Sequence, residues 1–241
     1  MESHSDQRQV VYVTGGSKGI GLGIAGYLLG KGYRIAVSSR DLDALQKATA
    51  PFQAGDDRLL CLQSDVRNEE DERQAVQAIL KKWGRLDILV ANAGVGIFAP
   101  ISALTSEQWN QTIDTNLTGV FHSVKASLDA VKQAKGYIIT IASLAGTNFF
   151  AGGSAYNASK FGLVGFSQAL MLDVRQDDVK VTTIMPGSVT SHFNGHTPND
   201  DDGWKIQPED IGELIYDLLR MNRRALPSKV EIRPSKPPVK A

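Results

Sequence analysis

Three side chains in the second half of the chain could together move a proton. Tyr156 and Lys160 are spaced i, i+4, so both lie on one face if the segment from residue 154 is helical, and Ser143 precedes them. A free tyrosine has a pKa of about 10, and bringing that pKa near 7 needs about 4 kcal/mol. One cation at about 4 Å, in an effective dielectric near 20, supplies about that energy. The spacing therefore predicts a phenol whose pKa is lowered by the neighbouring ammonium.

A glycine-rich turn near the N-terminus could hold a phosphate group. The apolar run 10–13 leads into Thr14, and the residues that follow include Gly15, Ser17, Lys18, Gly19, Ile20 and Gly21 in the spacing G-x-x-x-G-x-G. Glycines here let the backbone approach a pyrophosphate, and the next helix N-terminus adds a favourable dipole. A second match, G-x-G-x-x-G at 21–26, lies inside the expected helix, where Gly23 and Gly26 are expected to serve close packing.

The end of the second expected strand selects between the nicotinamide dinucleotides. NAD sites usually place an acid there for the ribose 2′-hydroxyl, but this chain has Ser39 and Arg40, and Asp41 is expected to cap the next helix. Arg40, together with Lys18 in the adjacent turn, can bind a 2′-phosphate. Although both cations could equally be solvated surface charges, the missing acid favours NADP(H) over NAD(H).

Apolar strand-like runs alternate with helical patterns along the chain. Strands are expected at 10–13, 34–38, 59–62, 86–90, 137–141, 181–184 and 230–232, and helices at 19–29, from 41, at 68–83, 105–132, 154–174 and 209–219. Strands that are apolar throughout and separated by helices predict an α/β fold, a doubly wound parallel sheet of the Rossmann type with helices on both faces. Residues 1–241 are expected to form a single domain, with a substrate loop at about 188–206 and a loose tail at about 233–241.

Several candidate site segments follow strands of this expected sheet. Asn92-Ala93-Gly94 follows the fourth strand, Ser143 ends the fifth, and Pro186-Gly187 ends the sixth. Open parallel sheets bind their ligands at the carboxyl ends of the strands. The sequence therefore predicts that these segments converge with the glycine turn and the Tyr156–Lys160 pair on one rim.

These motifs resemble those of the short-chain dehydrogenase/reductase family in its compact single-domain branch. The resemblance covers about residues 8–232, and its motifs occur in order: Thr14-Gly15-x-x-x-Gly19-Ile20-Gly21, Asp65-Val66, Asn92-Ala93-Gly94, Asn116, Ser143, Tyr156-x-x-x-Lys160 and Pro186-Gly187. One departure is Ala91, where the family often has a second asparagine. That position is mainly structural in the family, so the departure leaves activity as the expectation.

The resemblance implies hydride transfer between NADP(H) and a carbonyl or alcohol. Tyr156 would be the general acid in reduction and the base in oxidation, while Lys160 would lower its pKa and hold the nicotinamide ribose. Ser143 would hydrogen-bond the substrate carbonyl and the developing alkoxide. Asn116 would kink its helix and hold a water of the proton relay.

The resemblance also implies which segments along the rim bind each part of the cofactor. Asp65 and Val66 would flank the adenine, and the backbone of Asn92, Ala93 and Gly94 would line the cofactor. After Pro186 and Gly187, the pair Val189 and Thr190 would receive the nicotinamide carboxamide. All of these positions come from the family pattern rather than from the spacing of this chain.

Charge and composition exclude some other functions. The 26 basic and 26 acidic residues balance, so no electrostatic argument favours nucleic acid or an anionic membrane. The single cysteine, Cys61, suits a reducing compartment, and the polar start of the chain lacks a signal core, so we expect a cytoplasmic protein. No metal is expected, because His192 and His196 lack a third ligand. The acids 200–202 are expected to form a solvated turn.

The substrate is defined less sharply than the cofactor. The apolar residues Ile97, Phe98, Leu144, Phe149 and Phe150 could wall the site, which favours an uncharged carbonyl. One alternative is a 3-oxoacyl-carrier-protein reductase, and a non-enzymatic alternative is an NADP(H)-sensing binding module. A nucleotide-sugar epimerase would need a longer chain. The long helices carry apolar residues on more than one face, which together with the family habit predicts a homodimer or homotetramer.

Overall fold

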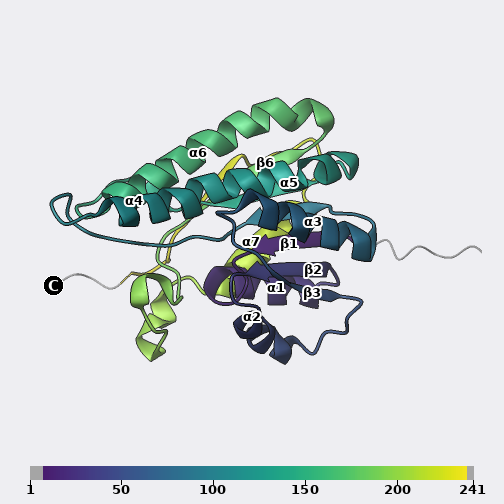
Figure 1. Cartoon of the computed structure of the whole chain (residues 1–241), viewed down its shortest axis with the longest axis horizontal. Helices are drawn as coiled ribbons and strands as arrows, with labels where there is room; N and C mark the ends of the chain where they lie inside the picture. The colour runs from purple at the N-terminus through teal and green to yellow at the C-terminus, as the bar shows by residue number, and fades with distance from the viewer. Residues whose placement is uncertain (1–7, 238–241) are drawn as a thin grey trace, which may run out of the picture.

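The computed structural model describes residues 8–237, and its centre is a fully parallel sheet (Figure 1). Within these residues the strands are β1 (Val10–Thr14), β2 (Arg34–Ser39), β3 (Leu59–Gln63), β4 (Ile88–Ala91), β5 (Tyr137–Ile141), β6 (Lys180–Pro186) and β7 (Lys229–Ile232). Their order is β3-β2-β1-β4-β5-β6-β7, and every neighbouring pair is parallel. The chain reverses its direction of winding between β1 and β4, which is where such sheets bind ligands.

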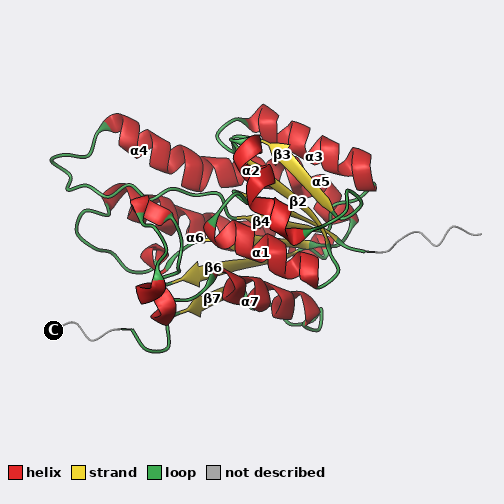
Figure 2. Ribbon diagram, turned by 90° about the horizontal axis from the view of Figure 1, so that it is seen from below, coloured by secondary structure: helices red, strands yellow, loops and turns green. Residues whose placement is uncertain are grey.

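Helices cover both faces of the sheet. One face carries α1 (Gly19–Gly30), α2 (Leu42–Thr49) and α7 (Pro208–Arg220), and the other carries α3 (Glu69–Trp83), α4 (Ser106–Ile113), α5 (Gly119–Gln133) and α6 (Ser154–Val174). Figures 1 and 2 show the two layers on opposite sides of the strands. The predicted doubly wound fold in one domain is confirmed.

Alternation along each strand builds two cores at once. In β1, Tyr12 packs into the core under α3, α5 and α6, whereas Val11 and Val13 pack under α1 and α7. Both sides are buried, so the strand reads as apolar throughout. The expected element boundaries hold within a few residues. The expected strand at 86–90 begins later, at Ile88, and Ser143 lies two residues beyond the end of β5 rather than at its end.

The long helix expected at 105–132 is interrupted. Thr105 and Gln108 form a capping box at its start, but Asp114–Thr118 adopts a π-helical turn between α4 and α5. Such a turn inserts an extra residue into the helix, and it occurs often at functional sites. Asn116 lies in this turn and is fully buried.

The glycines inside α1 serve packing, as predicted. A Cβ added to Gly23 would collide with Pro208 at the start of α7, and one added to Gly26 would lie 2.8 Å from the ring of Phe52. The close approach joins α1 to α7 and to the segment after α2. At the other end of the chain, Pro234 packs near Gly187, and the following residues up to 237 are exposed. The rest of the expected loose tail, 238–241, lies outside the described residues.

Candidate active site

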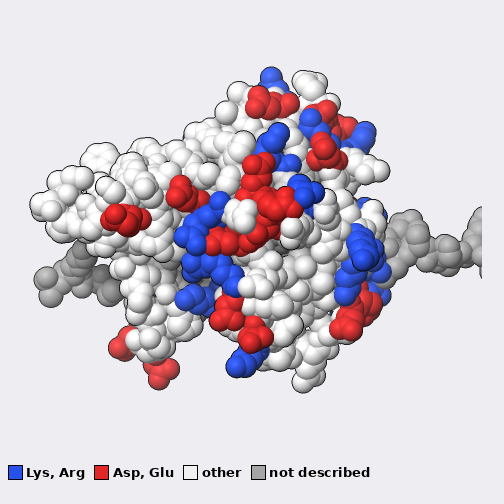
Figure 3. All heavy atoms as spheres, in the orientation of Figure 1, with Lys and Arg blue, Asp and Glu red and all other residues white. Residues whose placement is uncertain are grey.

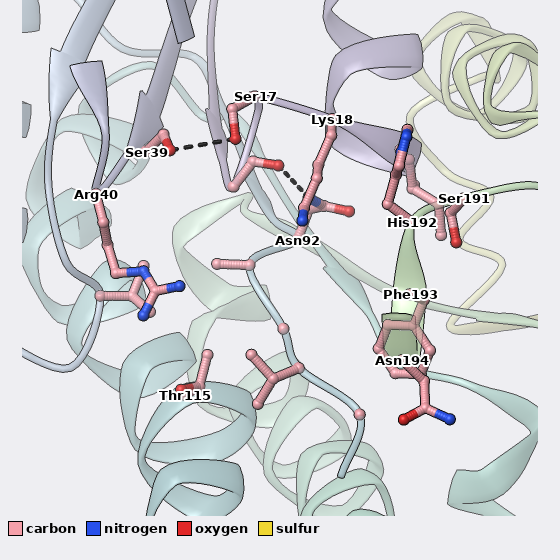
Figure 4. A pocket seen from close by; sticks show the side chains of 18 of the residues that line it. Ser17, Lys18, Ser39, Arg40, Asn92, Thr115, Ser191, His192, Phe193 and Asn194 are labelled. Atoms are coloured by element: carbon pink, nitrogen blue, oxygen red, sulfur yellow. Dashed lines mark hydrogen bonds between the residues drawn. The ribbon is translucent and has the colours of Figure 1, made fainter. Parts of the chain in front are cut away.

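A pocket of about 440 Å³ lies at the carboxyl edge of the sheet, beside the winding switch between β1 and β4. Its lining comes from the glycine turn, the ends of β2 and β3, the segment after β4, the π-helical turn and the loop after β6 (Figure 4). Twelve of the predicted cofactor-binding residues line it: Gly15, Ser17, Lys18, Gly19, Ile20, Ser39, Arg40, Asp65, Val66, Asn92, Ala93 and Gly94. Of the segments expected to converge, the glycine turn and Asn92-Ala93-Gly94 therefore meet in this pocket, whereas Ser143, Tyr156, Lys160, Pro186 and Gly187 lie outside its lining.

The glycine turn is shaped by close contacts. Gly15 and Gly19 have φ of +70° and +56°, which is a backbone conformation that favours glycine. A Cβ on Gly15 would lie 2.8 Å from the Cα of Ala93. Gly21 does not line the pocket. It packs directly against the carbonyl oxygen of Gly15 and the side chain of Asn92, and a Cβ at this position would collide with both. Gly21 therefore supports the turn from behind.

Asn92 fixes the turn against β4. Its side-chain amide donates to the carbonyl oxygens of Thr14 at 2.9 Å and Gly15 at 3.1 Å, as Figure 4 shows in part. The hydroxyl of Thr14 in turn accepts from the backbone N–H groups of Asn92 at 3.0 Å and Ala93 at 3.1 Å. These bonds hold both walls of the pocket in one geometry before any ligand arrives.

Cations gather at one end of the pocket. Lys18, Arg40 and Arg67 line it, and the Ser39 hydroxyl donates to the Ser17 hydroxyl at 3.2 Å between them (Figure 4). Of the pocket-lining residues in the described part of the chain, Asp65 is the one carboxylate. Arg67 binds it through Nε and Nη2 and holds the pKa of that carboxyl below its usual value. Arg67 was not predicted from the sequence, although it follows the Asp65-Val66 motif directly.

The proposed proton-transfer group lies next to this pocket without lining it. Tyr156 and Lys160 are 8% and 5% exposed, and the Lys160 Nζ lies 5.7 Å from the centroid of the Tyr156 ring. Lys160 donates to the Ile141 carbonyl at 3.0 Å, and the Ser143 side chain lies close enough to the Tyr156 phenol to act on its pKa. Gly94 joins the two regions, because it lines the pocket and a Cβ on it would lie 3.7 Å from the Lys160 Nζ.

Burial, more than the neighbouring charge, determines the ionisation of this group. It raises the pKa of Tyr156, and the nearby Ser143 side chain acts in the opposite direction. Burial also lowers the pKa of Lys160 to about 8, because the ammonium is taken out of water. The expectation that Lys160 lowers the pKa of Tyr156 is therefore wrong for the protein alone. The spacing argument counted the attraction between the two groups and omitted the desolvation of both.

Asn116 hydrogen-bonds the backbone of Val95, a residue of the pocket lining. Its Oδ1 accepts from the Val95 N–H at 2.8 Å, and its Nδ2 donates to the Val95 carbonyl at 2.9 Å and the Ser159 hydroxyl at 3.1 Å. Ser159 in turn donates to the Tyr156 carbonyl at 2.7 Å. Asn116 thus ties the segment after β4 to the helix that carries Tyr156. With these bonds made, both amide protons are used, so the predicted water cannot accept a hydrogen bond from this side chain.

The loop after β6 contributes Ser191 to the pocket lining, but not Val189 or Thr190. Val189 pairs with Ile206, and the Thr190 hydroxyl donates to the Asp202 carbonyl and accepts from Gln207. The assignment of Val189 and Thr190 to the nicotinamide carboxamide stays a prediction, and Ser191 is an additional lining residue. Pro186 and Gly187 likewise lie outside the lining, with Gly187 packed near Leu144 and Pro234.

Asp202 organises this loop from within. Contrary to the expected solvated turn, it is 4% exposed, and its carboxylate contacts the Nε2 of His196 at 2.6 Å and the Nζ of Lys205. These partners lower the pKa of Asp202 to about 2. Its carbonyl accepts from Thr190 and Gln207. His196 is therefore part of a loop clasp, and no group of three or more metal-ligating side chains occurs within the described residues.

Aromatic rings surround Tyr156. Phe98, from the segment after β4, and Phe193, from the loop after β6, have ring centroids 5.3 and 5.5 Å from that of Tyr156, both in edge contacts. Phe150 adds a contact with Phe98 at 5.5 Å, whereas the neighbouring Phe149 is 86% exposed. Of the expected apolar walls, Phe98 and Phe150 belong to this cluster. Phe193 was assigned only generally to the substrate loop.

No helix in residues 8–237 is both long and apolar enough to cross a membrane. The cytoplasmic location stays a prediction of the sequence.

The sheet order and the pocket define a class of protein. A glycine turn at the first strand, a switch point between β1 and β4, and a pocket along the carboxyl edge are the features of a dinucleotide-binding Rossmann-type domain.

Comparison with known proteins gives the family. The chain matches the family model described as short chain dehydrogenase over residues 9–202. It belongs to the short-chain dehydrogenase/reductase family, and it is an oxidoreductase of that family, whose members use nicotinamide cofactors.

Similar proteins include enzymes of several kinds. A glycine betaine reductase of Emericella nidulans is 30% identical and matches 96% of this chain, which spans 19% of that relative's length. An alcohol dehydrogenase of the archaeon Thermococcus sibiricus, solved with 5-hydroxy-NADP, is 26% identical with a TM-score of 0.89 over 97% of this chain and 100% of the other. A metagenomic short-chain oxidoreductase solved with NADP is 32% identical with a TM-score of 0.82, covering 95% and 98% of the two chains.

Proposed function

We propose that this oxidoreductase uses NADPH to reduce a carbonyl, or NADP⁺ to oxidise the alcohol, with Tyr156 as the general acid or base. The observation that carries the proposal is the buried pair Tyr156 and Lys160, with the half-buried Ser143 next to the phenol, beside a preformed dinucleotide pocket. Each member has a use in carbonyl chemistry: a proton donor, a cation and a hydroxyl.

The pocket fits NADP(H) better than NAD(H). Arg40, Lys18 and the Ser17–Ser39 pair lie where β2 ends, and no carboxylate stands at that strand end. The one carboxylate in the described lining, Asp65, is already bound by Arg67. The ribose hydroxyls of NAD(H) would find no free carboxylate here to accept their hydrogen bonds, whereas a 2′-phosphate would find cations. Two similar proteins of known structure were solved with NADP or a derivative of it.

Side chains of the protein would donate the proton to the substrate and stabilise the charge that develops on its oxygen. The raised pKa keeps the Tyr156 phenol protonated at neutral pH, which suits an acid that donates to the carbonyl oxygen. Ser143 would stabilise the same oxygen as negative charge develops. Lys160 has two ammonium protons without an acceptor in the described structure, and these could hold the ribose hydroxyls. When bound, the nicotinamide supplies or accepts the hydride.

The substitution Tyr156→Phe tests the proton donor. It removes one oxygen atom from a buried ring, so kcat should fall by about a thousandfold or more while NADPH affinity stays within about twofold of the original. Turnover would be followed as NADPH absorbance, and affinity by titration calorimetry. Persisting turnover in this variant would remove Tyr156 from the mechanism.

The same experiment separates the alternatives. A binding module without catalysis would bind NADPH in both proteins and show no turnover in either one. A 3-oxoacyl-carrier-protein reductase would prefer an acyl-thioester to a simple ketone. On the face in Figure 3 the basic clusters have acidic side chains beside them, so the charge of this face is mixed. Preference for the thioester would move the proposal to that alternative.

We also propose a homodimer or homotetramer, joined through the outer surface of α5 and α6. Phe121, Phe161 and Leu172 are between 43% and 53% exposed there, in addition to the apolar side that each helix turns to the sheet. Exposed apolar side chains of this size are typical of interfaces. Light scattering should give at least twice the chain mass of 26.1 kDa, and a monomer at micromolar concentration would contradict it.

A further inference from the structure

Three aromatic side chains from separate segments, Phe98, Phe150 and Phe193, form one aromatic cluster at Tyr156, and each is between 36% and 47% exposed. Phe98 contacts Tyr156, Phe150 and Phe193 with ring-centroid distances of 5.3, 5.5 and 6.1 Å, and every one of these contacts is edge-to-face. Edge-to-face packing aligns the positive edge of one ring with the negative face of another. The phenol therefore has the faces and edges of aromatic rings beside it, in addition to apolar surface.

One of these rings occupies the passage between the pocket and Tyr156. Phe193 lines the pocket and also contacts Tyr156 at 5.5 Å. A Cβ on Gly96 would collide with the Phe193 ring, so the ring fills the space that the missing side chain of Gly96 leaves. Under the proposed function a substrate carbonyl must reach Tyr156 beside the dinucleotide, and the Phe193 ring lies against Tyr156 on the pocket side.

The backbone around Phe193 is suited to a change in the position of its ring. Asn194 and Gly195 both have positive φ, at 53° and 74°, and they form a tight turn directly after Phe193. Asn and Gly adopt this conformation at low cost. The neighbouring loop residues, by contrast, are held by the clasp of Asp202 with His196 and Lys205. A short turn can therefore reorient Phe193 without unfolding the loop.

The charged residues of the described lining, Lys18, Arg40, Asp65 and Arg67, all belong to the glycine turn and to the ends of β2 and β3. Arg40, Asp65 and Arg67 lie away from Phe193, whereas Lys18 lies beside His192 and next to Gly19, which packs near Ser191 (Figure 4). Around Phe193 the lining consists of Gly96, Ile97, Ser191, His192, Asn194 and Gly195. Nothing in this set offers a permanent cation to a substrate carboxylate or phosphate.

We propose that the substrate is an uncharged aryl carbonyl, whose ring takes the place of the Phe193 ring against Phe98 and Tyr156. The inference rests on the proposed function, since it places the carbonyl beside Tyr156. In reduction the carbonyl carbon accepts the hydride of NADPH and its oxygen accepts the proton of Tyr156. NADPH is oxidised to NADP⁺ as the ketone is reduced to a benzylic alcohol.

Three ketones with eight carbons each test the substrate class: acetophenone, cyclohexyl methyl ketone and 2-octanone. Conjugation makes the aryl ketone the least reactive electrophile of the three. A preference for it would therefore come from the binding site and not from its intrinsic reactivity. The wild-type kcat/KM with NADPH should be about tenfold or more higher for acetophenone than for 2-octanone, with the cyclohexyl ketone between them. Equal values, or a preference for 2-octanone, would overturn the proposal.

Two variants test the position of the ring. Phe98→Leu keeps an apolar side chain but removes the aromatic partner, so the acetophenone to 2-octanone ratio should fall at least threefold. Phe193→Ala should keep this ratio, because the substrate ring replaces Phe193 rather than contacting it. If the acetophenone to 2-octanone ratio fell in Phe193→Ala, Phe193 would contact the substrate ring, which would contradict the proposal that the substrate ring replaces it. Met221→Leu, at the far end of α7, is the control and should leave the ratio unchanged.

Failure of the inference differs from failure of the proposed function. Turnover of all three ketones without an aryl preference would leave the NADPH-dependent reductase in place and remove the aromatic specificity. Absence of turnover with these ketones and with aldehydes, despite NADPH binding, would contradict both.

Discussion

The two ends of the pocket are built in different ways. At the end formed by the glycine turn, β2 and β3, backbone and short side chains are fixed by hydrogen bonds such as those of Asn92 to Thr14 and Gly15, and the lining is charged. At the Tyr156 end, the lining comes from aromatic rings and from a loop, and Phe193 fills part of the space. The first end is preorganised for a defined ligand, whereas on our proposal the second end rearranges to admit one. Binding of the dinucleotide and chemistry on the substrate should therefore respond separately to substitution.

The strongest expected separation comes from Ser143→Ala. Loss of the hydroxyl removes the group beside the Tyr156 phenol and, by the proposed mechanism, a hydrogen bond to the developing alkoxide. We expect kcat to fall by about a hundredfold to a thousandfold, with NADPH affinity unchanged. Ser143→Thr keeps the hydroxyl and should recover at least part of the rate. A parallel loss of NADPH affinity would show that the two ends are not independent.

The reciprocal effect is expected from Arg40→Asp. This change removes a cation from the charged end and adds the acid that NAD sites use, so NADPH affinity should fall about tenfold to a hundredfold and NADH affinity should rise. The kcat at saturating cofactor should change little. Arg224→Asp, on an exposed loop outside the pocket, is the charge-matched control. Calorimetry with both cofactors measures the result, and unchanged selectivity would remove Arg40 from the phosphate site.

Ionisation of Lys160 should make the rate of reduction depend on pH. Its pKa of about 8 is below the ordinary value of 10.5, so the ammonium is charged below pH 8 and neutral above it. The kcat/KM for reduction should be level near pH 7 and fall about tenfold per pH unit above 8. A profile that stays level to pH 10 would contradict the buried lysine as the ionising group.

A smaller effect is expected from Asp202→Asn. The carboxylate has its pKa lowered to about 2 by His196 and Lys205, so its contribution to the loop is present above about pH 4 and disappears as the pH falls towards 2. Neutralising it should speed hydrogen exchange of residues 190–206 and raise the substrate KM a few-fold. Asp201→Asn, an exposed neighbour, should have neither effect. Equal exchange in both variants would contradict the clasp.

The smallest effect concerns a buried acid behind the charged end. Glu72 is fully buried and accepts from the Tyr12 hydroxyl at 2.9 Å and from the Ser64 hydroxyl, and burial raises its pKa. The folded state therefore retains a proton that the unfolded state loses above about pH 4.3, so ionisation lowers the free energy of unfolding as the pH rises. Glu72→Gln should remove this slope and leave kcat unchanged. Chemical denaturation across pH 4 to 8 measures it.

The sequence predicted the charged end more completely than the Tyr156 end. Glycine spacing, an apolar strand and the missing acid at the end of β2 are local features, and each one constrains the backbone directly. Tyr156 and Lys160 were also found through local spacing. The π-helical turn at Asp114–Thr118 was foreseen only as a kink at Asn116, because it depends on the fit of Asn116 to Val95 and Ser159.

The loop after β6 shows what local patterns miss. Three consecutive acids favour a solvated turn, yet Asp202 is buried because His196 and Lys205 reach it from either side along the chain. Thr190 and Ser191 are adjacent and chemically alike, and the pairing of Val189 with Ile206 decides which of them meets the pocket. The balance of burial and attraction at Tyr156 also depends on the packed environment. These properties arise from tertiary contacts, which spacing alone does not define.

The most direct test of the account is oxidation of NADPH and NADH by the wild-type protein with acetophenone at pH 7, measured as initial rates of absorbance loss. The account predicts turnover, with kcat/KM for NADPH about tenfold or more above that for NADH. Absence of turnover with both cofactors despite binding, or a preference for NADH, would contradict it.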